Sequence, residues 1–279
     1  MRVHLAGVRG STPATGAAFA RYGGDTSCVA IAHDGADPVL VLDAGTGLAR
    51  VTALLDGPFR GTILLGHLHW DHTHGLPFFR AGDRDDATVR LRLPAAEGLT
   101  AEKTLARVLS PPHFPITPAG LRGRWTFDDL AEGRHETEGF VVHAREIPHP
   151  GGRTLGFRVS DGHSSVAYLT DHGPVALGPG PDGFGPYHDA ALALARDVDV
   201  LIHDAQYTAG EFDACRAFGH SSVDYALGLA DAAGAGRLVL FHHDPSRTDD
   251  RLDAIAATLP AGAVVARQGD VIRPRVLVQ

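Results

Sequence analysis

The pattern TILLGHLHWDH at residues 62–72 is the stretch on which the fold of this chain depends. Its first four residues are apolar or β-branched and predict a buried strand. The next positions place His67, His69, Asp71 and His72 directly after that strand. Imidazole and carboxylate groups together favour a borderline divalent ion, chiefly zinc, with manganese or iron as alternatives. Side chains two positions apart in an extended segment point the same way, so we expect His67 and His69 to share one ion, and Asp71 and His72 to hold a second.

Composition predicts a soluble globular protein. Hydrophobic residues make up 44% of the chain and charged residues 21%. No segment approaches the twenty apolar residues that span a bilayer, and the N-terminus lacks a secretory signal pattern. Cys28 and Cys215 are the only cysteines, so we expect no disulfide framework and a cytoplasmic location.

Net charge limits the partners that we expect. The value of −8 argues against an extended nucleic-acid surface and against binding to an anionic membrane. A small-molecule substrate is therefore the expected partner. Oligomeric state is left open by the sequence, with a homodimer as one option.

Strand patterns occur on both sides of a central region, residues 81–138, that is hard to interpret. Expected strands cover residues 2–8, 26–32, 38–43, 87–93, 140–147, 154–159, 164–170, 198–203 and 237–241, with closing strands within 263–278. Expected helices cover residues 48–55, 100–109, 190–196, 221–233 and 249–258, and another begins within 74–79 with its N-terminus toward the metals. Residues 173–186, dense in Gly and Pro, predict an exposed loop near the site. Without a linker or repeat, residues 1–279 are expected to form one domain.

The run from His67 to His72 resembles the His-x-His-x-Asp-His signature of the metallo-β-lactamase superfamily. That resemblance implies an α+β fold, a four-layer αββα sandwich in which two mixed sheets are covered by helices. The superfamily hosts many hydrolases, so the activity has to be inferred from the rest of the site.

The same resemblance implies the remaining metal ligands, each at the end of an expected strand. It matches His149 to the third imidazole of the first metal, Asp171 to a carboxylate that bridges both ions, and His242 to the last ligand of the second. His172 and His243 compete with their neighbours for these roles. The implied metal set is His67, His69, Asp71, His72, His149, Asp171 and His242.

A buried carboxylate beside the metals is a further feature of the superfamily, and Asp43 matches its place. The alternative is that Asp43 only forms a turn, for which Asp is a common residue.

Two more motifs resemble elements of tRNA 3′-processing ribonucleases. His203-Asp204-Ala205-Gln206 is similar to their His-Glu-Ala-Thr element, with Asp204 in place of Glu, and Gly219-His220-Ser221 is similar to their His-Ser-Thr element. The resemblance implies a pair in which Asp204 orients His220 to protonate a leaving alkoxide. The expected catalytic residues are Asp71, His220 and Asp204. For the second motif, the alternative is that Ser221 simply caps the following helix.

Nearly the whole chain resembles the phosphodiesterase branch of the superfamily, which includes phosphoribosyl cyclic-phosphate phosphodiesterases. The matching motifs are GVRGSTP at 7–13, YGGDTSC at 22–28, GLPFF at 75–79 and FHHDP at 241–245. The implied function is a binuclear metal-dependent hydrolase acting on a small, cyclic phosphodiester or a nucleotide. His74 departs from this pattern, because it adds an imidazole that the branch does not have. Residues 110–115 are expected either to form a wall of the substrate pocket or to be a plain connecting loop.

Three alternative functions remain. A tRNA 3′-processing endoribonuclease would need a tRNA-gripping arm between His149 and Asp171, but the 21 residues between them are taken up by two expected strands. A thioester or lactone hydrolase could use the same metal ligands. A non-catalytic metal-binding accessory protein is the alternative outside enzymes.

Overall fold

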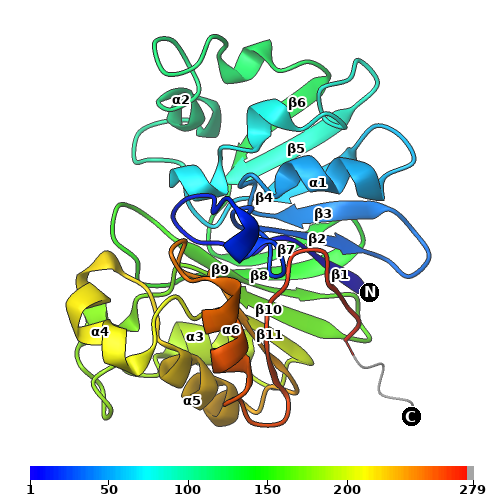
Figure 1. The fold of residues 1–279 in the computed structure, drawn as a ribbon. Helices are drawn as coiled ribbons and strands as arrows, with labels where there is room; N and C mark the ends of the chain where they lie inside the picture. The colour runs from blue at the N-terminus through cyan, green and yellow to red at the C-terminus, as the bar shows by residue number, and fades with distance from the viewer. Residues whose placement is uncertain (275–279) are drawn as a thin grey trace.

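The computed structural model describes residues 1–274, which fold into two facing seven-stranded mixed sheets (Figure 1). The first sheet has the order β14-β1-β2-β3-β4-β5-β6 and the second has the order β13-β12-β11-β10-β9-β8-β7. In each sheet three neighbouring pairs are antiparallel and three are parallel. The two sheets therefore have the same mixture of antiparallel and parallel pairs, which makes the sandwich pseudo-symmetric.

The strands of the first sheet are β1 (Arg2–Gly7), β2 (Cys28–Ala32), β3 (Pro38–Leu42), β4 (Arg60–Leu64), β5 (Thr88–Leu93), β6 (Arg124–Asp129) and β14 (Val271–Ile272). Those of the second are β7 (Gly133–Thr137), β8 (Phe140–Glu146), β9 (Leu155–Ser160), β10 (Ser165–Leu169), β11 (Val200–Asp204), β12 (Leu238–Phe241) and β13 (Ala263–Val265). The helices are α1 (Leu48–Val51), α2 (Ala101–Ala106), α3 (Asp189–Ala195), α4 (Ala209–Cys215), α5 (Val223–Ala233) and α6 (Asp249–Ala256). Among residues 1–274, no helix has both the length and the apolar character to cross a bilayer.

Three buried apolar clusters define the four layers. One lies between the sheets and combines residues of both, for example Leu64 of β4 with Phe157 of β9 and Phe241 of β12. A second packs α1 and α2 onto the outer face of the first sheet. A third packs α3, α5 and α6 onto the outer face of the second sheet. Because each sheet buries both faces, the expected four-layer α+β sandwich is confirmed.

The parallel strands of both sheets bring their carboxyl ends to the same edge of the sandwich. Most expected site residues lie at or just after the ends of β3, β4, β10, β11 and β12, while His149 follows β8 and His220 precedes α5. In mixed and parallel sheets this edge is where ligands usually bind. The topology therefore gathers residues that lie far apart in the chain.

Several expectations were wrong. Residues 74–79 do not begin an α-helix, because the backbone of Phe79 leaves helical geometry, with ψ 88°, so that only a 3₁₀ turn forms over Leu76–Phe78. Strands β6 and β7 and helix α4 were not predicted. The expected closing strands are reduced to β13 and β14, and residues 275–278 lie outside the described residues.

We predict that Phe157→Ala destabilises the fold by about 3–5 kcal/mol, because it opens a cavity between the sheets. Urea unfolding followed by circular dichroism measures this change. Phe218→Ala is the matched control, since that side chain is 62% exposed, and it should change the unfolding free energy by less than about 0.5 kcal/mol. Equal effects of the two substitutions would contradict the assignment of the core.

Candidate metal centre

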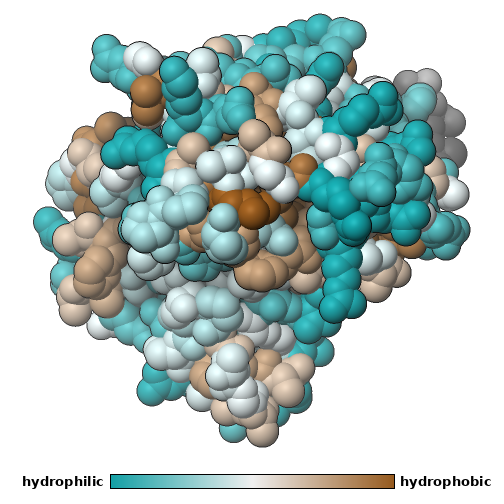
Figure 2. Space-filling model, turned by 90° about the horizontal axis from the view of Figure 1, so that it is seen from above, coloured by the Kyte–Doolittle hydropathy of each residue, from teal (hydrophilic) through white to brown (hydrophobic). Residues whose placement is uncertain are grey.

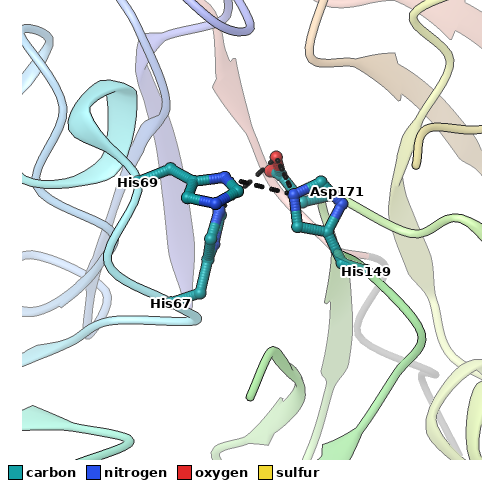
Figure 3. A group of neighbouring side chains, drawn as sticks. All are labelled: His67, His69, His149 and Asp171. Carbon is teal, nitrogen blue, oxygen red and sulfur yellow. Dashed lines mark hydrogen bonds and ion pairs between the residues drawn. The ribbon is translucent and has the colours of Figure 1, made fainter. Parts of the chain in front are cut away.

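The first cluster at the sheet edge contains His67, His69, His149 and Asp171, whose ligand atoms lie within 4.8 Å of one another. The Nδ1 atom of His69 is 3.2 Å from Nε2 of His149. Oδ1 of Asp171 lies 3.6 Å from Nε2 of His149 and 3.7 Å from Nε2 of His67. Figure 3 shows the imidazoles of His67 and His69, which share one loop, converging with that of His149 and with the carboxylate of Asp171. This arrangement matches the set implied for the first metal.

The second cluster contains Asp71, His72, Asp171 and His242, all buried. Oδ2 of Asp171 lies 2.9 Å from Nε2 of His72 and 3.1 Å from Nε2 of His242. Nε2 of His242 is also 3.1 Å from Oδ2 of Asp71. Asp171 thus turns one carboxylate oxygen toward each cluster, which is the geometry of a bridging ligand.

Buried nitrogens without a hydrogen-bond partner test whether this cluster suits a cation. Within residues 1–274, both ring nitrogens of His67 and Nε2 of His72 lack such a partner. Nε2 of His72 is close to Asp171, but the contact is not aligned as a hydrogen bond. A buried polar atom left unpaired is costly, and a divalent cation bound to these lone pairs removes that cost. The histidine and aspartate groups therefore suit divalent metal ions.

Three neighbouring groups fix the orientation of the ligand imidazoles. Nδ1–H of His72 donates to Oδ2 of Asp43 over 2.8 Å. Nδ1–H of His149 donates to the carbonyl of Gly219 over 2.7 Å. Nδ1–H of His242 donates to Oε1 of Gln206 over 3.1 Å. Each bond leaves the lone pair of Nε2 facing the cluster. Groups that accept a bond from the other ring nitrogen usually orient a histidine in this way when it binds a metal.

Asp43 is therefore more than a turn residue. Besides His72, its carboxylate accepts bonds from the N–H of Gly66 at 2.7 Å and from the hydroxyl of Tyr168 at 2.8 Å. Asp43 is fully buried, so these three bonds satisfy a carboxylate that would otherwise be costly to bury. They also tie β3, β4 and β10 to the second cluster.

Left-handed backbone conformations occur at three of these strand ends. Asp43, Asp171 and His242 have φ values of 58°, 54° and 60°. Such values are unfavourable for residues other than glycine and concentrate at functional sites. Here they turn the chain sharply after β3, β10 and β12, so that the side chains lie at the shared edge.

Electrostatics set the protonation of the clusters. Burial and the neighbouring imidazole of His72 hold the pKa of His67 well below its usual value. Burial alone would raise the pKa of Asp171, but His242 and His72 lower it well below its usual range. Burial would lower the pKa of His72, but the three neighbouring carboxylates of Asp171, Asp71 and Asp43 raise it well above. A proton held on His72 would have to leave before a cation binds.

The pair formed by Asp204 and His220 lies beside both clusters. Nδ1 of His220 is 2.8 Å from Oδ2 of Asp204, and both side chains are buried. The ring of His220 lies 5.1 Å from that of His149 and 5.0 Å from that of His242, between centroids. The other oxygen of Asp204 accepts from the N–H of Ser221 at 3.1 Å. The pair expected from the two motifs therefore forms.

Capping of α5 differs from the sequence-based alternative. Ser222, not Ser221, is the N-cap, because its hydroxyl accepts from the N–H of Tyr225. Ser221 contacts Asp204 instead. Ser222 therefore caps the helix, and Ser221 supports the Asp204–His220 pair.

The two competing histidines do not join the clusters. Nε2 of His243 bonds the carbonyl of Ala266 at 2.9 Å. His172 contacts His203 at 2.9 Å and His188 at 2.7 Å. The sequence did not indicate that Gln206 orients His242 or that Gly219 orients His149. Both residues were noted only as members of the motifs that contain Asp204 and His220.

A cleft of about 590 Å³ opens beside the first cluster. Its walls include His67 and His69 together with Arg107, Arg153 and Glu97. Arg153 is also paired with Glu146 over 3.3 Å, so the guanidinium of Arg107 is the main positive charge beside the histidine cluster, where it favours an anionic ligand.

Comparison with known proteins places this fold among hydrolases. Ribonuclease Z of Lacticaseibacillus casei (strain BL23) is 27% identical over 254 residues, covering 75% of this chain and 76% of that protein. A diphosphatase from the PhnP family has a similar fold, with a TM-score of 0.68, 21% identity and coverage of 99% of this chain and 98% of that one. The short form of human tRNase Z has a TM-score of 0.68, 20% identity and coverage of 99% and 100%.

A family model described as the β-lactamase superfamily domain matches residues 39–243. That range begins just before Asp43 and includes every ligand of both clusters. With its two mixed sheets and its paired histidine and aspartate clusters, the chain belongs to the β-lactamase superfamily.

Proposed function

We propose that this protein is a binuclear metal-dependent phosphodiesterase that acts on a small phosphodiester or nucleotide. The observation that carries the proposal is the buried Asp204–His220 pair beside two ligand clusters. Metal clusters alone would serve a thioester or lactone hydrolase equally well. An oriented imidazole beside them adds a proton donor for a poor leaving group.

The proposed ligands of the first metal are His67, His69 and His149, and those of the second are Asp71, His72 and His242, with Asp171 shared. Zinc is the proposed ion, because imidazole and carboxylate ligands suit it, and manganese and iron are the alternatives. Two such cations would lower the pKa of a water molecule and neutralise phosphate charge. We treat residues 1–279 as one domain.

His220 has the proposed role of general acid. Its Nδ1 is held by Asp204, so Nε2 carries the proton to be donated to the leaving oxygen. His220 also lies near His242 in a third group that could bind a cation. Because His242 turns Nδ1 toward Gln206 and Nε2 toward Asp171, we assign His242 to the second metal and His220 to proton transfer. Asp71, held by the N–H of Ser11 at 2.7 Å, completes the proposed catalytic set.

Support for a phosphorus substrate comes from the cleft and from the relatives. Arg107 and Arg153 line the cleft beside His67 and His69, where guanidinium groups favour phosphate oxygens, and Arg153 is also paired with Glu146. The names of two relatives, a ribonuclease and a diphosphatase, both denote cleavage at phosphorus. A neutral thioester or lactone would not use the two guanidinium groups. A non-catalytic accessory role would not explain why an oriented proton donor, the Asp204–His220 pair, lies beside the clusters.

The second candidate, tRNA 3′-end processing, is favoured by the similarity to ribonuclease Z. Against it, residues 150–170 are occupied by β9, β10 and their short connections. No long insertion is present there within the described residues. The net charge of −8 also opposes tight binding to RNA.

We predict that His220→Ala retains its metal but loses activity toward phosphodiesters with alkyl leaving groups by about 10²–10⁴-fold. Nitrophenyl esters should be affected much less, because their leaving group needs no proton. Steady-state kinetics on both ester classes and metal analysis give the comparison. His163→Ala, an exposed histidine in the β9–β10 turn, is the control. Equal losses on both classes would remove His220 from the acid role.

We also predict that the zinc-loaded protein hydrolyses bis(p-nitrophenyl) phosphate and does not bind precursor tRNA at low salt. Binding is measured by gel shift, and processing by the length of 5′-labelled precursor on a denaturing gel. Specific cleavage at the tRNA 3′ end would favour the ribonuclease alternative and contradict the small-substrate proposal.

A further inference from the structure

An apolar pocket of about 280 Å³ lies outside the metal clusters and is not used by the proposed chemistry. One wall comes from the segment that follows the metal-binding run, with Trp70, His74 and Phe78. The other comes from the end of α2 and the loop after it, with Val108, His113 and Phe114. Residues 110–115, for which the sequence left two roles open, thus wall a pocket.

Aromatic rings line this pocket in two pairs. Trp70 and His74 are stacked, with centroids 5.6 Å apart and an angle of 17° between the rings. Phe78 and Phe114 meet edge to face, with centroids 5.9 Å apart. His74, the imidazole that the superfamily pattern does not predict, therefore backs one face of Trp70. A flat indole held in this way is a stacking platform.

Both principal rings of the pocket are exposed to solvent. Trp70 is 65% exposed and Phe78 is 61% exposed. Covering either ring with a ligand would remove apolar surface from water, which is favourable. Figure 2 views the molecule from the side of α2 and β6, where apolar residues lie among hydrophilic ones. Large aromatic side chains exposed beside a pocket often mark a binding site.

The pocket is joined to the metal centre in two ways. Trp70 lies between His69 and Asp71, one proposed ligand of each metal, in the 3₁₀ turn Trp70–His72. The carbonyl of Trp70 accepts from the N–H groups of Thr73 and His74 at 3.1 and 2.9 Å, which fixes this turn. Val108 lines both the pocket and the cleft that contains His67 and His69. The pocket and the cleft therefore adjoin at Val108.

We propose that this pocket binds the base of a nucleoside phosphodiester, stacked on the exposed face of Trp70. The inference rests on the proposed phosphodiesterase function and narrows its substrate to nucleotides. Nucleobases stack on aromatic side chains and carry polar edges. Besides the rings, His113 lines the pocket as a polar side chain, whereas the hydroxyls of Thr46 and Thr73 already bond Asp25 and the carbonyl of His69. An aliphatic chain would use neither the flat platform nor the imidazole of His113.

The first test uses Trp70 as its own reporter. The chain has two tryptophans, so Trp125→Phe leaves Trp70 as the sole one. In the zinc-loaded variant, adenosine monophosphate should quench the emission of Trp70 excited at wavelengths where the base does not absorb. Ribose 5-phosphate, which has the phosphate but no base, should not. If neither ligand changes the emission of Trp70, the proposal is overturned. It is also overturned if the emission changes with protein concentration alone, because a second copy of the chain would then cover the pocket.

The second test compares affinities by calorimetry. The zinc-loaded protein should bind adenosine monophosphate at least tenfold more tightly than ribose 5-phosphate. Trp70→Ala should abolish this preference, Trp70→Phe should keep part of it, and Phe78→Ala should weaken it. Val264→Ala, which truncates an exposed apolar residue on β13, is the control and should keep it. The ratio of the two affinities is the readout, since general damage to phosphate binding affects both ligands.

The two proposals can fail separately. A preference for adenosine monophosphate without phosphodiester hydrolysis would leave the base pocket standing and refute the proposed function. Hydrolysis with equal affinity for both ligands, or with a preference that Trp70→Ala leaves unchanged, would refute the base pocket alone.

Discussion

The carboxylate of Asp171 is the interaction on which the rest of the site depends. Its two oxygens face different clusters, one toward His67 and His149 and the other toward His72 and His242. These histidines come from both sheets, so the carboxylate joins the two halves of the sandwich at one edge. Burying it is tolerable because imidazoles surround it.

Backbone geometry and hydrogen bonding prepare this arrangement. Three strands end in left-handed residues, and two of these, Asp171 and His242, are proposed ligands, while the third, Asp43, holds His72. The packed sheets at whose ends these residues lie stabilise the strained backbone conformations. Gly219 shows the same principle in a loop. It has φ 82°, and a side chain at this position would collide with Pro150 and crowd His149, whose Nδ1–H its carbonyl accepts.

The sequence predicted the fold class and the clustered residues because both depend on local, readable patterns. Apolar runs ending in His or Asp mark buried parallel strands, and the His67–His72 signature is specific to the superfamily. Edge strands β6 and β7 were missed because few of their residues are buried. The alternation in β6 covers only Trp125 and Phe127, and β7 has no apolar residue. Helix α4 had a readable signal, since Glu211 accepts from the N–H of Thr208 in a capping box. Partners such as Gln206 and Gly219 could not be predicted, because their role depends on tertiary contacts.

Counting metal ions tests the central claim most directly. The zinc-reconstituted protein, analysed by plasma mass spectrometry and by anomalous diffraction at the zinc edge, should contain two ions per chain, both contacting Asp171. A single ion, or two ions on separate faces of the molecule, would contradict the account.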